Sequence, residues 1–514
     1  MKSVMKHNFS QVPKADIPRS SFNRSHGHKT TFNAGELIPI YVDEALPGDT
    51  FNAKLTAFGR LATPIHPFMD NMYLDTHFFA VPLRLIWDNW EKFNGAQDAP
   101  GDTTDYLIPT MASPSGGYTA SSMSDYFGIP TLVENLEHSA LWHRAYNLIW
   151  NEWFRDQNLQ DPVPVPTGDG PDDPADYTVL RRGKRHDYFT SALPWPQKGP
   201  SVDLPLGTSA PVTGITRVGP DNSSNTAGLV TTASSVDFNN GISAVNFAVD
   251  TSGVGLEADL TAATAATINQ LRQAFQIQKL YERDARGGTR YIEILKSHFG
   301  VTSPDARLQR PEYLGGSSSP IQLNPVAQTM ETTVDSPQAN LAAYGTVGMR
   351  PHGFNKSFVE HCVVIGFASM RADLTYQQGL NRMFSRSTRW DFYWPALSHI
   401  GEQAVLNKEI YADGSATDEE VFGYQERFAE YRYKPSLITG EFRSNFAQSL
   451  DTWHLSQDFA SLPALNSSFI EEQPPVDRVI AVPSSPHLIL DTYMMLNTAR
   501  PMPVYSVPGL IDHF

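Results

Sequence analysis

The sequence predicts a mainly β protein, a β-sandwich whose connections between strands are greatly expanded. Short apolar stretches alternate with Pro and Gly breaks over residues 34–82, and β signals return from residue 320 onward. Period-two apolar positions between such breaks are typical of β-strands. Helical patterns and a long insertion lie between these two regions, so one sandwich is expected to draw its strands from both ends of the chain.

Length and composition favour long loops over charged helical bundles. The chain has 514 residues, more than one compact core normally uses. Only 18% of the residues are charged, below the ~25% usual in globular chains, and 38 are prolines. No run approaches the ~18 apolar residues of a membrane span. The first residues lack the apolar core of a secretory signal, so we expect a soluble product made in the cytoplasm.

Two helices are expected after the first strands. Residues 83–95, "LRLIWDNWEKFNG", predict a helix that ends on Gly95, a residue that favours C-caps. Residues 138–158 give a stronger helical signal, and the tryptophans of this second helix are expected in the core. Its apolar stripe at helical spacing consists of Leu141, Ala145, Leu148, Ile149 and Trp153.

An acidic, proline-rich stretch follows at residues 160–176, and this much proline excludes regular structure. Its carboxylates could gather around calcium, which prefers oxygen ligands. The spacing does not fit the known calcium-loop signature, so we predict a solvated loop and no cofactor, with calcium as the open alternative. The carboxylates concerned are those of Asp169, Asp172, Asp173 and Asp176.

Positive charge is concentrated at the amino terminus, although the whole chain carries a net charge of −16. Residues 1–30 have a net charge of +5, which leaves −21 for the rest. Such an arm could contact nucleic acid, and a solvated tail is the alternative. The basic residues of the arm are Lys2, Lys6, Lys14, Arg19, Arg24 and Lys29.

A second basic cluster occurs in "VLRRGKRHDYF". It could contact phosphates, or it could pair with carboxylates in a structural or interface role, which we favour. The cluster consists of Arg181, Arg182, Lys184, Arg185 and His186.

Residues 203–262 differ in composition from the rest of the chain. Small and polar residues dominate this segment, and Tyr and Trp are absent from it. It is too long for a plain loop. We therefore expect an insertion with weak β structure that projects from the body.

The stretch "DARGGTRYIEIL" could be a phosphate-binding loop or a corner between two helices. A helical pattern precedes Gly287 and Gly288, whereas a nucleotide fingerprint would require a strand there. The glycines are therefore predicted to end one helix. Thr289 is expected to cap the next, with Ile292 and Leu295 facing inward.

Catalytic signatures are missing from the sequence. The single cysteine, Cys362, lies in a run that reads as a buried strand, and it allows no internal disulfide. His26 and His28 have no second pair of ligands at a zinc spacing. The nucleophile elbow, the P-loop and the zinc-protease motif do not occur. We therefore predict that the protein is not an enzyme.

Several long strings resemble one family closely. Residues 268–316, "INQLRQAFQIQKLYERDARGGTRYIEILKSHFGVTSPDARLQRPEYLGG", resemble the signature of the gokushovirus major capsid proteins. Gokushoviruses are small single-stranded DNA phages of the microvirus group, the Microviridae. "SFNRSHGHKTTFNAGELIPIYVDEALPGDTF", "DYFTSALPWPQKG" and "MPVYSVPGLIDHF" agree as well. The resemblance covers nearly the whole chain except residues 203–262.

The resemblance implies an eight-stranded antiparallel viral jelly roll with long inserted loops and several helices. It divides the chain into a basic arm (1–33), a first jelly-roll part with helical insertions (34–202), the variable insertion (203–262), and further helices with the remaining strands (263–514). About sixty copies would form a T=1 icosahedral capsid around single-stranded DNA. The expected location is the virion, after assembly in the host cytoplasm.

The resemblance also implies partners and surfaces. The partners are the genome, a small basic DNA-packaging protein, internal scaffolding and pilot proteins, and a host cell-surface receptor. The insertion would form a threefold protrusion that contacts the host, with Phe238 and Phe247 shared among three copies. Trp195 and Pro196 in residues 187–199, together with residues 476–514, are the interface candidates.

Two alternatives stay open. A jelly-roll carbohydrate-binding or carbohydrate-cleaving protein, such as a tail-fibre-like phage protein, would gather aromatic and acidic residues in one groove and would not form shells. A DNA-binding protein in its own right conflicts with a body charge of −21, because phosphate neutralisation dominates such binding.

Overall fold

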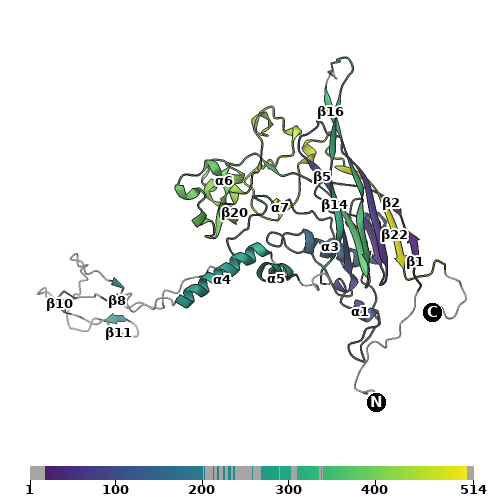
Figure 1. Cartoon of the computed structure of the whole chain (residues 1–514), viewed down its shortest axis with the longest axis horizontal. Coiled ribbons are helices and arrows are strands. Elements are labelled where there is room, and N and C mark those ends of the chain that lie inside the picture. The colour runs from purple at the N-terminus through teal and green to yellow at the C-terminus, as the bar shows by residue number, and fades with distance from the viewer. Residues whose placement is uncertain are drawn as a thin grey trace. The chain divides into compact units, whose positions relative to one another are not determined.

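The computed structural model describes residues 18–200, 202, 268–288, 290–302, 309–334, 337–338 and 340–505, together with six short strands between residues 212 and 258. The chain forms two compact units. One comprises Met1–Pro196 and Thr289–Phe514, and the other comprises Gln197–Gly288. The main sheets belong to the first unit (Figure 1).

The larger sheet joins the two ends of the chain. Its last strand in sequence, β22, pairs with β4 on one side and with β1 and β2 on the other, all antiparallel. The sheet has the order β1 (Ser20–Asn23), β22 (Leu488–Arg500), β4 (Thr50–Leu61), β16 (Leu341–Ser357) and β15 (Gln322–Ala327), with β2 (His26–Phe32) also on β22. Strands from both ends of the sequence are therefore neighbours, as predicted.

The smaller sheet is also antiparallel. Its order is β14 (Glu312–Pro320), β5 (Met72–Pro82), β17 (Cys362–Ala372) and β3 (Ile38–Ala45). The strands predicted over residues 34–82 are thus confirmed as β3, β4 and β5. The fold is mainly β, with antiparallel sheets.

The two sheets differ in how they are covered. Side chains of β4 alternate between buried and exposed, which is the pattern of a sheet with one face in the core and one in solvent. Almost every side chain of β17 is buried, because the smaller sheet is covered on both faces. On the face shared by the sheets, the ring of Phe78 lies 5.4 Å from that of Phe354 on β16.

The other face of the smaller sheet is covered by α3 (Leu141–Ile149), which continues as a π-helical turn at Trp150–Phe154. The ring of Tyr146 lies 5.6 Å from Phe367 on β17, and its hydroxyl donates to the carbonyl of Leu37 (3.0 Å). Trp150 is buried and donates to the carbonyl of Arg181 (2.8 Å). The predicted helix is confirmed.

A separate cluster of buried side chains forms a lobe of the first unit. It surrounds the hairpin of β19 (Glu402–Leu406) and β20 (Val421–Glu426), with α6 (Asn407–Ile410) between them. Glu409 is buried here and accepts from Tyr188 (2.9 Å) and Arg382 (2.8 Å). The first unit has further short elements: α1 (Trp90–Phe93), α2 (Met123–Tyr126), α7 (Ser467–Ile470), β6 (Thr110–Ala112), β7 (Glu137–Ser139), β18 (Thr375–Tyr376) and β21 (Ser436–Leu437).

Two sequence predictions were wrong in detail. The single helix expected over residues 83–95 is a 3-10 turn at Leu83–Leu85 followed by α1, because the buried indole of Trp87 interrupts it and donates to Asp169 (2.7 Å). Gly95 does adopt the left-handed conformation expected there (φ 94°). The β signals after residue 320 include "ERFAEYRYKPSLITGEF", residues 426–442, but this stretch leaves the β conformation at Phe428, whose φ is 62°.

The glycine pair lies where a helix ends, as predicted. α4 (Ile268–Gly287) stops there, and Gly288 has a φ of 92°. α5 (Tyr291–Phe299) begins after Arg290, whose backbone N–H donates to the Glu293 carboxylate (3.3 Å). Arg290 therefore occupies the N-cap position that was predicted for Thr289, which itself lies outside the described residues.

The insertion contains the weak β structure that was expected. Its six short strands form three antiparallel pairs: β8 (Val212–Thr213) with β13 (Glu257–Ala258), β9 (Arg217–Val218) with β10 (Ser224–Asn225), and β11 (Val230–Thr232) with β12 (Ser235–Asp237).

A buried ion pair anchors the acidic loop. The Arg144 guanidinium on α3 binds Asp172 through two nitrogens (2.8 and 2.6 Å), and both side chains are almost fully buried. Arg144 also donates to the carbonyl of Gly168, and Tyr177 donates to Asp172 (2.5 Å). Burial acts to raise the pKa of Asp172, but the hydrogen bonds from Arg144 and Tyr177 outweigh it and hold that pKa below its ordinary value.

Replacing Asp172→Asn should lower the free energy of unfolding by about 3–5 kcal/mol, because Arg144 would stay buried without a countercharge. Chemical unfolding of the purified subunit measures this loss. Because the pKa of Asp172 is depressed in the folded state, the stability it contributes is present above its unfolded pKa and is lost as the pH falls. The difference between the proteins should therefore shrink in acid.

The exposed Asp176→Asn is the matched control and should leave stability unchanged. Equal stability of Asp172→Asn and the unchanged protein would contradict the role of the ion pair. Stabilisation by added calcium that Asp172→Asn abolishes would instead favour the calcium alternative.

Candidate functional site

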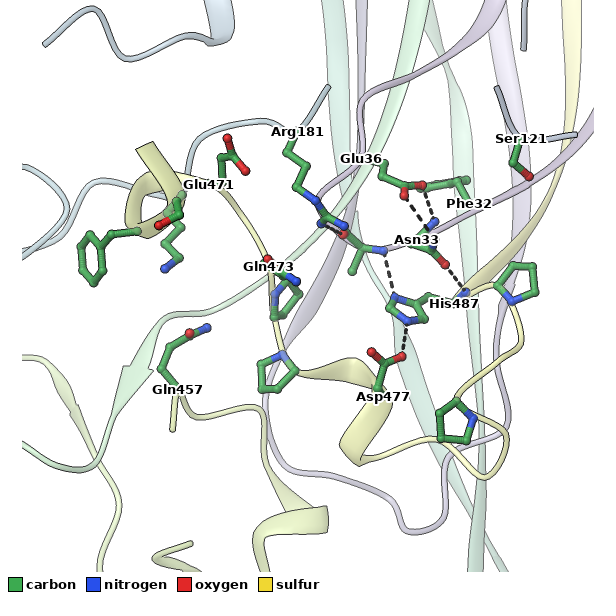
Figure 2. A pocket seen from close by; sticks show the side chains of 18 of the residues that line it. Phe32, Asn33, Glu36, Ser121, Arg181, Gln457, Glu471, Gln473, Asp477 and His487 are labelled. Atoms are coloured by element: carbon green, nitrogen blue, oxygen red, sulfur yellow. Dashed lines mark hydrogen bonds and ion pairs between the residues drawn. The ribbon is translucent and has the colours of Figure 1, made fainter. Parts of the chain in front are cut away.

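A polar cavity of about 690 Å³ lies between residues 31–36, Arg181 and the segment 457–487 (Figure 2). Its charged side chains are of both signs and include Glu36, Arg181, Lys184 and Asp477. Arg181 donates to the carbonyl of Ala34 (2.8 Å), and Glu36 accepts from the backbone of Asn33 (2.9 Å). These polar groups hold the segments of the protein together.

His487 is the one lining residue that resembles a catalytic group, since it pairs with Asp477 (2.8 Å). Figure 2 shows its ring between the Asn33 segment and Asp477. Its Nδ1 accepts from the backbone N–H of Ala34 (3.0 Å), so Nε2 carries the proton and donates to Asp477. Both ring nitrogens are occupied within the fold, so the ring is not available as a general base.

The basic cluster predicted at residues 181–186 is held by partners within the chain. Arg182 binds Asp75 (2.7 Å), and Arg185 binds Asp373 (2.7 Å). Lys184 is buried with its ammonium over the ring of Phe469 (4.5 Å), and burial lowers the pKa of that ammonium. The pairing with carboxylates that the sequence favoured is present, and it occurs within one chain.

The arm residues lie in two environments. Arg24 makes a bidentate ion pair with Asp43 (2.7 and 2.8 Å), and Lys29 lies 3.5 Å from Asp491 on the exposed face of β22. Arg19 donates to Thr50 (2.9 Å). Residues 20–32 of the proposed arm are thus strands of the larger sheet. Lys2, Lys6 and Lys14 lie outside the described residues.

Three carboxylates of the acidic loop contact protein groups. Asp169 accepts from Trp87 and Asn89 (2.9 Å), Asp172 binds Arg144, and Asp173 caps a 3-10 turn by accepting from Ala175 (2.9 Å). Among the residues that the structure describes, no group of three or more His, Cys, Asp or Glu side chains could hold a metal.

Cys362 is buried on β17, where its thiol donates to the carbonyl of Glu360 (3.5 Å). Burial raises the pKa of the thiol to about 12, so the group stays protonated and unreactive at neutral pH. The prediction of a packed thiol is confirmed.

Of the two residue pairs predicted to lie on contact surfaces, the structure describes one. Trp195 is half-buried and Pro196 exposed, which leaves both accessible to a neighbour. Phe238 and Phe247 lie outside the described residues. None of the helices formed by the described residues combines the length and apolar character that a membrane span needs.

An exposed group of large rings, which we call the aromatic patch, was missed by the sequence analysis. It consists of Phe384, Trp390, Phe392, Tyr393 and Trp394, whose exposed fractions run from 43% to 70%. The signal was present in "RWDFYWP", where aromatic residues crowd without strand or helix periodicity. Large exposed apolar patches are a common feature of interaction surfaces.

Several rings of the aromatic patch contact neighbouring residues of the chain. Trp394 donates its indole N–H to the carbonyl of Arg389 (2.9 Å), and the Arg389 guanidinium stacks on Trp390 (4.6 Å). Arg386 stacks on Tyr431 (4.3 Å) and pairs with Glu430 (3.3 Å). The five rings nevertheless remain partly exposed.

Comparisons with known proteins agree with these observations. A model of the capsid protein (F protein) family matches residues 10–510. The chain is 55% identical over 525 residues to the capsid protein VP1 of Bdellovibrio phage phiMH2K, covering 99% of this chain and 98% of that one. It is 46% identical to capsid protein VP1 of Chlamydia phage 1 (99% and 98% covered) and 38% identical to that of Spiroplasma virus 4 (98% and 97%).

All three relatives are gokushoviruses, so the resemblance found in the sequence is confirmed. The chain therefore belongs to the capsid protein (F protein) family, as a structural major capsid protein of a virion and not an enzyme.

Proposed function

We propose that about sixty copies of this chain close into a T=1 icosahedral shell around a single-stranded DNA genome. At 57.0 kDa per chain, such a shell would weigh roughly 3.4 MDa. Membership of a capsid protein family supports self-assembly, and the aromatic patch is the observation that carries the proposed contact between subunits.

The body of each subunit is proposed to be an eight-stranded jelly roll. Without β1 and β2, which both pair with β22, the larger sheet has four strands. The smaller sheet also has four strands, and both contribute to one core. This four-on-four antiparallel arrangement supports the jelly-roll assignment.

The occupant of the aromatic patch is a second copy of the chain. Aromatic residues and Arg are enriched at the centres of protein interfaces, where charge is depleted. Two of the neighbouring arginines are neutralised, Arg386 by Glu430 and Arg382 by Glu409, and Arg389 stacks on the exposed rings. Apolar ring surface thus makes up most of the patch, which suits an apolar partner. Trp195 and Pro196 are a second, smaller candidate contact.

Replacing both Trp390→Ala and Trp394→Ala should abolish shell formation and leave the subunit folded. Truncating an aromatic side chain at the centre of an interface typically costs about 2 kcal/mol or more, and the loss recurs at each copy of the contact. Light scattering and electron microscopy of purified particles measure assembly, while thermal unfolding reports on the subunit.

The matched control is Phe58→Ala, which removes an equally exposed ring from β4 (57%) and should leave assembly intact. Normal shells from the double tryptophan variant would refute the interface. Shells that form but lose their DNA would assign the patch to the genome.

The remaining partners follow from charge and from the family. The basic arm is proposed to face the interior, with Lys2, Lys6, Lys14 and Arg19 as its main charges, because Arg24 and Lys29 pair with Asp43 and Asp491 of the same chain. Its net charge of +5 per chain cannot balance both an acidic body and a genome, so a separate small basic packaging protein is required. Internal scaffolding and pilot proteins would act during assembly in the host cytoplasm.

Residues 203–262 are proposed to form a threefold protrusion that contacts a host receptor. Alone, this segment of small side chains buries too little apolar surface to offset its ordering entropy, whereas three copies could share Phe238 and Phe247. Replacing residues 205–260 by a short Gly/Ser linker should leave shells forming and abolish attachment to cells. Particle counts and a cell-binding assay measure the two effects separately.

Loss of the shell in that deletion would show that the insertion is structural. Unchanged attachment would remove its receptor role and leave it a solvated decoration.

A further inference from the structure

We propose that a second cavity, beside the basic cluster, binds phosphate groups, either those of a nucleic acid strand or free phosphate ions. The cavity has a volume of about 400 Å³, within the ~300–1,000 Å³ range of small-ligand sites. It lies where five segments of the first unit meet: the turn after α3, residues 182–186, the start of α5, the end of β17 and the end of α7.

Cationic side chains dominate the lining. Asp156 is the single carboxylate among the described residues that line the cavity. The cations that line the cavity are Arg155, Arg182, Lys184, Arg185, Arg290 and Arg371, and His186 lines it as well. Guanidinium groups that converge from separate segments are the usual recognition element for phosphate.

The carboxylates behind these arginines are shared unevenly. Arg182 and Arg371 both bind the same buried carboxylate, that of Asp75 (2.7 and 2.6 Å). Arg185 binds Asp373, and Arg290 contacts both Glu152 and Glu293. Arg155 donates to the carbonyl oxygen of Gln160 (2.9 Å), which is not a carboxylate. Among the described contacts, Arg155 is therefore the guanidinium group of this cavity without an ion pair.

Unused donors point to the same conclusion. Within the described structure, the buried Nε groups of Arg155, Arg182 and Arg185 have no hydrogen-bond partner. A buried N–H group without an acceptor is costly. A phosphate group brings three acceptor oxygens and up to two negative charges into a cavity that has an excess of donors.

The cations that line the cavity repel one another, and this repulsion affects the pKa values of two arginines. Burial lowers the pKa of Arg155, and the neighbouring charge of Arg290 lowers it further. Burial also lowers the pKa of Arg371, where the attraction of Asp75 is opposed by the charges of Arg182 and Arg185. A bound phosphate would relieve both repulsions.

The cavity has room for more than the phosphate itself. Trp153 and Phe154 line it beside the cations and pack on the hydrophobic core behind it, so they form a firm wall of the cavity. The nucleic acid source rests on the proposed function, since only a genome-enclosing shell brings such a strand to the subunit. Binding of the phosphate group itself does not depend on assembly.

Titration calorimetry of full-length subunits before assembly tests the site, with inorganic phosphate, thymidine monophosphate and an eight-residue oligothymidylate as probes at low salt. Arg155→Gln is the test variant, because it removes a charge without leaving a carboxylate unpaired. Its affinity for each probe that the unchanged protein binds should fall about tenfold, the usual effect of losing one charged hydrogen bond. Oligonucleotide binding that is tighter than phosphate binding and weakens with salt assigns the site to the genome. Equal affinities assign it to free phosphate.

The matched control is Arg432→Gln, which removes an exposed arginine paired with Glu426 away from the cavity and should leave binding unchanged. Absence of binding by the unchanged protein, or equal affinity of Arg155→Gln, would overturn the proposal. Shell formation and thermal unfolding of both variants are measured alongside. If shells form but the protein does not bind phosphate, the phosphate site is refuted and the proposed function stands. If the protein binds phosphate but does not form shells, the proposed function is refuted and the phosphate site stands.

Discussion

The pairing of β22 with β4 is the contact on which the rest of the fold depends. It runs in continuous register from Leu488 opposite Leu61 to Ala499 opposite Thr50. Because the last strand completes a sheet begun by the first strands, the intervening residues must leave the sheet and return to it. The connections can therefore be long and variable without disturbing the core. The aromatic patch lies in one of them, and the basic cavity is built from several of them and the end of β17.

The same constraint explains which strands could be predicted. β4 and β22 alternate apolar and polar residues because one face of their sheet is exposed, and β17 is a continuous apolar run because both of its faces are covered. β14 was missed because "YLGGSSSP" has little intrinsic strand preference. Its glycines have a packing role, since a Cβ on Gly316 would lie 2.1 Å from the carbonyl oxygen of Thr76.

The functional surfaces were less predictable because they depend on long-range contacts. The sequence identified the cluster from Arg181 to His186, but it could not show that Arg155, Arg290 and Arg371 converge on the same cavity. It could not show either that Asp75 serves two arginines at once. The carboxylate of Asp172, considered for calcium from its neighbours in sequence, binds an arginine 28 residues away.

Charge is the property that connects these surfaces. A body with a net charge of −21 repels its copies, so contacts between subunits must gain free energy from burial of apolar area. The aromatic patch meets this need because its arginines are either neutralised by carboxylates or stacked on the exposed rings. The basic cavity is the opposite case, since cationic side chains from several segments dominate its lining. An acidic subunit can thus associate with its own copies through one surface and still attract a polyanion at another.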